Sequence, residues 1–366
     1  MDRATIDVYD ERAQEWRDDR RPRQLDAVRR FATRVTGPGA VLDAGCGPGW
    51  YSGALGPRVV ALDASRAMLA MARDEAPGAW PVLADLAQLP FARHALAGAY
   101  ASKSYVHLAR SSLPLAWHDL HRTLAVGAPI ELVLFPTAAD AADEELAPFP
   151  HDPFEGRRFS GWTRPLLDDV IAGAGFTDVR IDEGAGTHTD HLVVRATRAR
   201  TLADTVGPAM RLLVCGLNPS LHAADAGIGF VTAGNRFWPA ALASGIVSVD
   251  RDPVHALVHH GIGMTDLVKR ASPRAAELTR AEYTAGLARL DRLVSWLQPG
   301  AVCVVGLAGW RAAADRKASA GVADRTLGGR PVYVMPNPSG INGSSSLADL
   351  TDHLRAAAAL ADRAAG

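Results

Sequence analysis

The run Val41-Leu42-Asp43-Ala44-Gly45-Cys46-Gly47-Pro48-Gly49 joins an apolar stretch to a loop in which three alternate residues are glycine. The apolar part predicts a buried strand. Glycine permits the sharp turn that follows, and it lets a ligand lie against the main chain without meeting a Cβ atom. A tight turn with no ligand has the same pattern, so the meaning of the loop depends on its neighbours.

Carboxylates follow the second predicted strand and the unit after it. Residues 59–62 form a second apolar run that ends at Asp63, and a third unit gives Leu83-Ala84-Asp85-Leu86. A carboxylate at the end of the second strand suits both hydroxyls of a ribose, whereas Asp85 and Leu86 suit the amine and the face of an adenine. Because successive parallel strands end along one crevice, these features predict a site for a nucleoside cofactor.

The first half of the chain alternates short strands with helices, which predicts a mostly parallel, twisted sheet. Strands are expected at residues 40–42, 59–62, 97–101 and 130–135, helices at 64–74, 113–124 and 163–174, and two last strands at 178–183 and 191–196. A second alternation begins at residues 211–215, with strands expected at 301–305 and 332–335 and helices at 236–244, 280–296 and 347–361. We therefore expect two α/β domains, at residues 1–198 and 199–366.

Two loops of the second half have similar sequences. The first apolar strand runs into Gly216-Leu217-Asn218-Pro219-Ser220, and the strand at 332–335 runs into Pro336-Asn337-Pro338-Ser339-Gly340-Ile341. Asn-Pro is also a common turn former. Two such loops, with the aromatic Phe230 between them in the chain, nevertheless predict a site at one edge of a parallel sheet.

Composition restricts the function classes. The net charge is −1, but residues 199–366 hold 17 Lys and Arg against 13 Asp and Glu, which is compatible with a phosphate backbone as partner. Three scattered cysteines (Cys46, Cys215 and Cys303) predict buried thiols rather than a disulfide framework, a metal site or an iron–sulfur cluster. We expect no signal peptide and no membrane span, and therefore a soluble protein of the cytoplasm, associated with the nucleoid if bacterial, that acts as a monomer.

The first half resembles the class I S-adenosylmethionine-dependent methyltransferases over about residues 5–197. The glycine loop, the following Leu62-Asp63-Ala64-Ser65-Arg66-Ala67-Met68-Leu69 and the Ala84-Asp85 pair carry the resemblance, and residues 9–16 resemble the helix that lids the cofactor in that family. It implies a Rossmann-like, seven-stranded domain with S-adenosylmethionine as cofactor. It also implies a set of cofactor-binding residues: Asp43, the three glycines Gly45, Gly47 and Gly49 toward the methionine end, Asp63 at the ribose, and Asp85 and Leu86 at the adenine.

The methyl acceptor is left open. Residues 102–107, Ser-Lys-Ser-Tyr-Val-His, lie where acceptor-side residues are expected, at the end of the fourth strand. They lack the Asn/Asp-Pro-Pro-aromatic pattern of enzymes that methylate base amines. His107 is either a base for the reaction or a structural side chain. Methyl transfer from a sulfonium often needs only in-line positioning, so a dedicated base is not required.

The second half resembles the mismatch-specific uracil/thymine-DNA glycosylases, within the uracil-DNA glycosylase superfamily, over residues 211–360. Both Asn-Pro-Ser loops carry the resemblance, together with Asn235-Arg236-Phe237-Trp238 and residues 261–268. It implies a three-layer α/β/α domain with a mostly parallel sheet. Its partner would be double-stranded DNA with a G·U or G·T mismatch, from which the damaged base is removed for repair, without a metal.

Excision of a base requires that the nucleotide leave the duplex stack. The resemblance implies Asn218 as the catalytic residue, which orients water through its amide oxygen, and Phe230 as the platform for the base. Ile341 would fill the vacated space, and the remaining substrate-binding residues would be Ser220, Asn337, Ser339 and Gly340. Ser220 replaces a family glycine and Gly343 replaces a family arginine. These departures keep a second interpretation open, in which this half only binds nucleic acid and delivers the methyltransferase to it.

Overall fold

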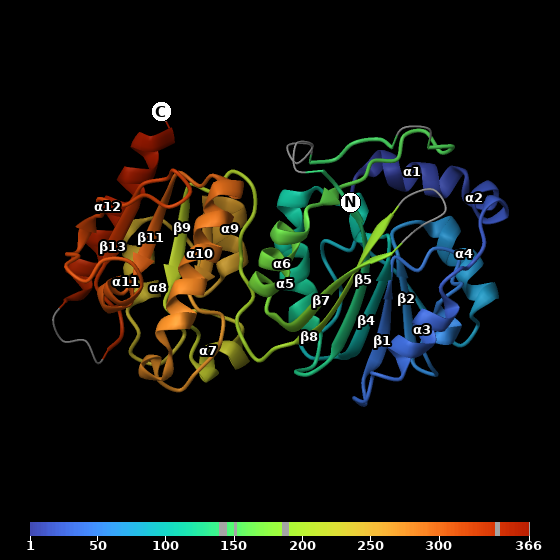
Figure 1. Cartoon of the computed structure of the whole chain (residues 1–366), viewed down its shortest axis with the longest axis horizontal. Helices are drawn as coiled ribbons and strands as arrows, with labels where there is room; N and C mark the ends of the chain where they lie inside the picture. Colours follow the sequence, from blue (N-terminus) through green and yellow to red (C-terminus); the bar gives the residue numbers. More distant parts are fainter. Residues whose placement is uncertain (139–144, 150–151, 185–189, 341–344, 366) are drawn as a thin grey trace. The chain divides into compact units, whose positions relative to one another are not determined.

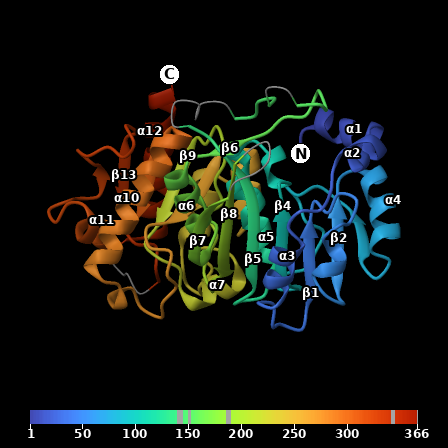
Figure 2. The same ribbon diagram turned by 45° about the vertical axis from the view of Figure 1, so that its right-hand side comes forward.

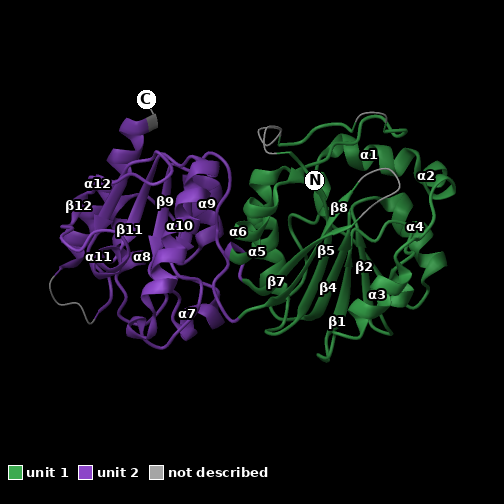
Figure 3. Ribbon diagram, viewed as in Figure 1, with its two compact units in different colours: residues 1–172, 176–199 green, residues 173–175, 200–366 purple. Residues whose placement is uncertain are grey.

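The computed structural model describes residues 1–138, 145–149, 152–184, 190–340 and 345–365. The chain divides into two compact units, one of residues 1–172 and 176–199 and the other of residues 173–175 and 200–366 (Figure 3). Each unit has its own sheet (Figure 1). No helix within these described ranges is long and apolar enough to cross a bilayer.

The sheet of the first unit has the strand order β3-β2-β1-β4-β5-β8-β7, and the short β6 pairs with β5 beside this path. The strands are β1 (Ala40–Ala44), β2 (Val59–Asp63), β3 (Trp80–Leu83), β4 (Leu96–Ser102), β5 (Pro129–Pro136), β6 (Gly161–Trp162), β7 (Phe176–Gly184) and β8 (His191–Arg198). Strands β1 to β5 run parallel, whereas β8 is antiparallel to both β5 and β7. This is the Rossmann-like sheet that the sequence predicts, with β6 as an additional strand.

Helices pack around this sheet. They are α1 (Arg3–Glu11), α2 (Ala13–Asp19), α3 (Leu25–Ala32), α4 (Arg66–Glu75), α5 (Leu113–Thr123) and α6 (Arg164–Gly173). Helix α4 begins two residues later than predicted because Ser65 caps it: the Ser65 hydroxyl accepts the Met68 N–H at 3.1 Å. Strands β1 and β4 are buried almost throughout, as parallel strands covered on both faces are.

The sheet of the second unit has the order β10-β9-β11-β13-β12, and only β12 runs antiparallel to its neighbour in the described sheet. Its strands are β9 (Leu212–Gly216), β10 (Ile262–Asp266), β11 (Ala301–Val305), β12 (Gly321–Val322) and β13 (Val332–Met335). Its helices are α7 (Leu221–Ala226), α8 (Phe237–Ser244), α9 (Pro253–His260), α10 (Arg280–Leu297), α11 (Leu307–Ala313) and α12 (Leu347–Ala365).

The core of the second unit explains its three layers. Apolar residues of β9, β11 and β13 form one cluster with α8 and α12 on one face of the sheet, including Val214, Trp238 and Leu354. Helix α10 lies on the other face and buries Leu290 and Val294 (Figure 2). This is the expected α/β/α arrangement. The three cysteines are free and buried, as predicted.

Candidate active sites

The glycine loop follows β1 directly and has three left-handed residues. Gly45, Gly47 and Gly49 have φ of 72°, 53° and 84°. A Cβ atom on Gly45 would lie 2.2 Å from the Ser104 Cβ, and one on Gly49 would lie 2.8 Å from the Ala72 Cα. A Cβ on Gly47 would meet nothing within 4 Å. Packing therefore requires the outer two glycines, whereas the middle one leaves open space over the main chain.

Asp63 lies at the end of β2 and holds this loop in place. Its Oδ2 accepts the Gly47 N–H at 2.9 Å, and its Oδ1 accepts the Ser65 N–H at 2.9 Å. Burial raises the pKa of this carboxyl above its ordinary value. Because each carboxylate oxygen can accept a further hydrogen bond, Asp63 retains capacity for two hydroxyl groups.

The Asp43 carboxylate is buried and bonded to a neighbouring side chain, whereas contact with a ligand requires an accessible group. Asp43 is only 2% exposed, and the Ser52 hydroxyl donates to its Oδ2 at 2.6 Å. Burial raises the pKa of Asp43 to about 7. In this structure Asp43 supports the loop through Ser52.

Asp85 and Leu86 follow β3. The Asp85 Oδ1 accepts the Ala87 N–H at 2.8 Å, and its Oδ2 forms an ion pair with the amino group of Met1. Leu86 is buried. The amino group of Met1 therefore contacts Asp85, the carboxylate for which the resemblance implies a role at the adenine.

Helix α1 packs against the start of α4 and also contacts the segment that follows β4. Asp10 accepts hydrogen bonds from the Ser65 hydroxyl at 2.7 Å and from the Ala67 N–H at 3.0 Å. Tyr9 bonds to Nε2 of His107 at 2.9 Å, while Nδ1 of His107 bonds to the Arg158 carbonyl at 2.8 Å.

His107 is thus a structural side chain in this structure. Burial lowers its pKa to about 4, so the imidazole is neutral near pH 7, and both of its ring nitrogens are engaged. Of the two interpretations of His107, the geometry favours the structural one.

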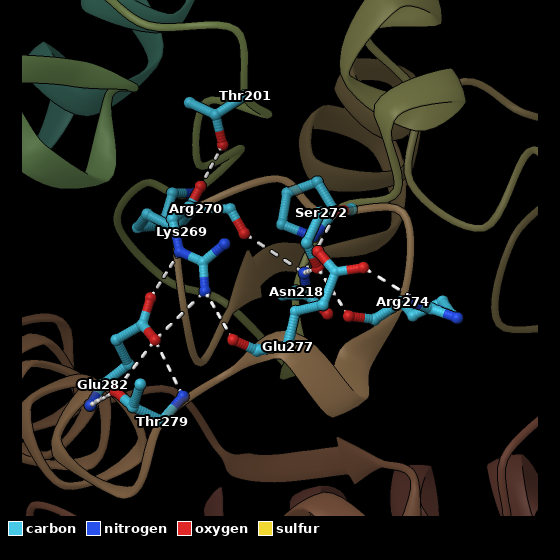
Figure 4. Close-up of polar contacts among 10 residues, drawn as sticks. Thr201, Asn218, Lys269, Arg270, Ser272, Arg274, Glu277, Thr279 and Glu282 are labelled. Carbon is cyan, nitrogen blue, oxygen red and sulfur yellow. Dashed lines mark hydrogen bonds and ion pairs between the residues drawn. The ribbon is translucent and has the colours of Figure 1, made fainter.

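Asn218 follows β9 in the second unit, and its amide group is held by a neighbouring loop. The Asn218 Nδ2 donates to the Ser272 hydroxyl at 2.9 Å, the Arg270 carbonyl at 3.1 Å and the Pro219 carbonyl at 3.2 Å (Figure 4). Within the part of the chain that the structure describes, its Oδ1 accepts no hydrogen bond. The arrangement fixes the nitrogen end of the carboxamide and leaves the oxygen end available to water.

The loop that holds Asn218 is anchored on helix α10. The Arg270 guanidinium makes two hydrogen bonds to the Glu282 carboxylate, at 2.6 and 3.1 Å, and one to the Glu277 carbonyl at 3.0 Å (Figure 4). Glu282 in turn forms the capping box of α10 with Thr279. The orientation of Asn218 thus depends on a helix start more than sixty residues along the chain.

Phe230 lies close to the end of the same strand. Its ring stacks on Phe237 with the centroids 4.3 Å apart, and a Cβ on Gly216 would lie 3.3 Å from its ring. Phe230 has a left-handed φ of 59° and remains partly exposed. Ser220 caps α7, because its hydroxyl accepts the Ala223 N–H at 3.1 Å.

The second Asn-Pro-Ser loop packs on the segment that carries Phe230. The Arg236 N–H donates to the Pro338 carbonyl at 2.9 Å, and the Arg236 side chain donates to the Ser339 carbonyl at 3.3 Å. Asn337 is exposed and accepts the Ser339 N–H at 3.0 Å, and Gly340 packs against Gly234. Ile341 and Gly343 lie outside the described residues.

Both loops follow parallel strands of one sheet. Strands β9 and β13 each pair in parallel with β11, so their carboxyl ends meet the same edge. Asn218 and the Asn337–Gly340 loop therefore lie at that one edge. Phe230 borders Gly216, two residues before Asn218, and stacks on Phe237, whose neighbour Arg236 donates its N–H to the Pro338 carbonyl.

Comparison with known proteins follows the same division. Residues 203–360 match the uracil DNA glycosylase superfamily, and residues 41–127 match a methyltransferase domain. The chain contains both domains. The matching family model describes the superfamily as a whole.

Solved structures similar to this chain include several methyltransferases. One is a SAM-dependent methyltransferase from Methanosarcina mazei, with 17% identity, 46% of this chain and 95% of that chain covered, and a TM-score of 0.40. Another, from Mesorhizobium loti, has 21% identity, coverage of 48% and 97%, and a TM-score of 0.39. Magnesium protoporphyrin IX methyltransferase from Synechocystis has 18% identity, coverage of 53% and 98%, and a TM-score of 0.42.

The residues of the methyltransferase domain fit S-adenosylmethionine. The open space over Gly47 is a cradle that a Cβ would enter, and the Asp63 carboxylate lies beside it with free acceptor capacity. These two features are what a nucleoside with a vicinal diol requires.

The glycosylase-superfamily domain has functional candidates that sequence reasoning missed. Asp266 ends β10 beside Gly216, and Arg270 and Ser272 hold Asn218. The sequence could have indicated Asp266, because a carboxylate at the end of a buried parallel strand lies at the same sheet edge as Asn218. The two glycines near Ile262 concealed that strand, since glycine is depleted in strands.

Proposed function

We propose that the glycosylase-superfamily domain hydrolyses the N-glycosidic bond of uracil, and more slowly of thymine, in mismatched double-stranded DNA. The observation that carries the proposal is the meeting of Asn218, Phe230 and the Asn337–Gly340 loop at one edge of the sheet. A pyrimidine extruded from the duplex would stack on Phe230, and Ile341 would fill the space that it leaves.

Cleavage breaks the bond between C1′ of the sugar and N1 of the base. The electron pair leaves with the base, and water adds its hydroxyl group to C1′ and gives its proton to the departing base. The Asn218 Oδ1, left open by the bonds that fix Nδ2, would hold that water. Because a carboxamide is a weak base, we propose a slow reaction with a largely dissociative transition state.

The methyltransferase domain uses S-adenosylmethionine as methyl donor. When bound, this cofactor supplies an electrophilic methyl group. We propose that Gly45, Gly47 and Gly49 lie along its methionine end, that Asp63 binds its ribose, and that Asp85 and Leu86 hold its adenine. Asp43 would act through Ser52 by keeping the loop in shape.

The decisive test of the first proposal is base excision by the purified full chain. A duplex with a single G·U pair is incubated with the protein, and abasic sites are revealed by alkaline cleavage. Excision by the wild type and not by Asn218→Ala supports the glycosylase. Duplex binding without excision would support the alternative, in which this domain only delivers the methyltransferase to nucleic acid.

A further inference from the structure

Lys103 directly follows β4 and lies beside the glycine loop of the methyltransferase domain. The hydroxyl of its neighbour Ser104 donates to the Ala44 carbonyl at 2.5 Å, and a Cβ on Gly45 would lie 2.2 Å from the Ser104 Cβ. Lys103 has a left-handed φ of 59°, and its N–H donates to the Val133 carbonyl at 2.9 Å. This conformation costs free energy for a residue other than glycine and is typical of residues placed for a function.

The Lys103 ammonium group has no anionic partner among the residues that the structure describes. It lies 5.5 Å from the centroid of the Phe135 ring, is half-buried, and makes no hydrogen bond or ion pair in those ranges. Burial lowers the pKa of Lys103, and the nearby Arg20 and Arg23 lower it further. A half-buried cation among other cations is costly, and an anion beside it offsets that cost.

Arg20, which directly follows α2, is a second half-buried cation that forms no ion pair within the described part of the chain. Its guanidinium lies over the rings of Trp16 and Phe154, at 5.5 and 5.7 Å, and its Nε is buried without a hydrogen-bond partner. Asp152, an acid near Arg20, is bonded to Arg157 instead, at 3.0 Å. Arg20 therefore keeps donors that packing does not satisfy, and such donors call for a ligand.

Aromatic rings connect Arg20 to the glycine loop. Trp16 stacks on Trp50, which directly follows Gly49, with the ring centroids 5.3 Å apart and the planes at 23°. Both indole rings remain partly exposed. Lys103 thus flanks one end of the glycine loop, and Arg20 flanks the other end through Trp16. Arg20 is also close enough to act on the charge of Lys103, so the two cations can serve one ligand.

We propose that Lys103 and Arg20 bind the carboxylate of the methyl acceptor, and that this acceptor is a small organic acid with a flat aromatic ring. The inference rests on the cofactor site proposed above, which places the methyl group at the glycine loop. A carboxylate offers hydrogen-bond acceptors to an ammonium group and to a guanidinium group together. The rings beside the two cations offer faces on which a flat ligand stacks.

Other anions suit these side chains less well. A nucleic-acid backbone is bound by cations that cluster on an exposed face, whereas Lys103 and Arg20 are half-buried and lie against aromatic rings. An inorganic anion would use the two charges but not the rings. The combination of charge and aromatic surface therefore favours an aromatic acid.

The test compares the binding of benzoate with that of benzamide, which has the same flat ring without the charge, and of acetate, which has the charge without the ring. The full chain is saturated with S-adenosylhomocysteine, and binding is measured by calorimetry and ligand-detected NMR. We expect benzoate to bind at least about tenfold more tightly than either comparison ligand, as one hydrogen bond between charged groups allows. We expect Lys103→Gln and Arg20→Gln each to lower benzoate affinity about tenfold.

Control variants separate loss of charge from loss of structure. Lys103→Arg keeps the cation and should keep the preference for benzoate. Lys317→Gln and Arg30→Gln remove exposed cations elsewhere in the chain and should bind benzoate as the wild type does. Circular dichroism verifies folding, and if Lys103→Gln does not fold, Arg20→Gln serves the comparison.

Each outcome has one meaning. The proposal is overturned if the wild type does not bind benzoate, if benzamide or acetate binds as tightly, or if both glutamine variants keep the wild-type preference. Displacement of benzoate by a short RNA oligonucleotide would assign the cations to a phosphate backbone and would also overturn it. A wild type that does not bind S-adenosylhomocysteine overturns instead the cofactor site on which the proposal rests.

Discussion

The side-chain amide of Asn218 donates a hydrogen bond to the carbonyl of Arg270, 3.1 Å away across 52 residues of sequence. The guanidinium of that same Arg270 is fastened to Glu282, at the start of α10. The proposed catalytic side chain is therefore held through a loop whose anchor is an ion pair (Figure 4).

Loss of this anchor should slow excision without removing any group that touches the base. We expect Arg270→Ala to reduce the single-turnover rate roughly tenfold, because small misplacements of a reacting group are expensive. Glu282→Gln is the matched variant, since it breaks the ion pair while keeping the cation and a residue that suits the capping box. Equal losses would indicate positioning of Asn218. A loss in Arg270→Ala alone would show that this arginine acts on the DNA instead.

Asp63 should govern affinity for S-adenosylmethionine. We expect Asp63→Ala to weaken binding by about 1–3 kcal/mol, the range for losing buried hydrogen bonds to hydroxyl groups. Isothermal calorimetry measures the change, and the exposed Asp26→Asn on α3 is the control. Unchanged affinity in Asp63→Ala would show that the ribose lies elsewhere.

Alanine substitutions at Gly45 and Gly47 should differ in their effects on stability and on cofactor affinity. Gly47→Ala adds a methyl group to open space at a φ of 53°, so we expect a loss of about 1 kcal/mol in stability but a large loss of cofactor affinity. Gly45→Ala drives a methyl group into Ser104 and should unfold the domain at a clearly lower temperature. Thermal melts with and without cofactor separate the two effects. Equal cofactor affinity in Gly47→Ala and the wild type would show that the cofactor does not contact this loop.

The buried Asp43 should make the methyltransferase domain less stable at high pH. Its pKa of about 7 in the folded state lies above its ordinary value of 3.8, so the cost of ionising it is absent in acid and grows as the pH rises through about 7. We expect Asp43→Asn to be more stable than the wild type at pH 8 by up to about 4 kcal/mol. This advantage should vanish near pH 4. Denaturant unfolding at both pH values measures it, and an advantage that does not change with pH would contradict the assignment.

Local patterns in the sequence predicted most of the sheet framework. The apolar runs that became β1, β2, β4 and β5 are short and bounded by glycine or acidic residues. The hydrophobic pattern and the flanking residues therefore indicate the same strands. The same agreement predicted β9, β11 and β13. Strand β10 was missed because Gly261 and Gly263 break its pattern, and its place in the sheet depends on pairing with β9 rather than on propensity.

The site was less predictable than the fold for a physical reason. Asn218 and Phe230 were identified because their types and spacing have chemical meaning. Arg270 and Ser272 act through a main-chain carbonyl and a hydroxyl, and nothing in their local sequence indicates which amide they hold. Contacts between distant segments, which only the folded chain brings together, carry that information.

The central claim is that the Asn218 carboxamide steers water to the sugar of an extruded pyrimidine. Single-turnover excision from a G·U duplex by the wild type, Asn218→Ala and Asn218→Asp tests it most directly. We expect slow but measurable excision by the wild type, at least about a hundredfold less with alanine, and partial or full activity with aspartate, which keeps an oxygen acceptor. Equal rates for the wild type and Asn218→Ala would contradict the account.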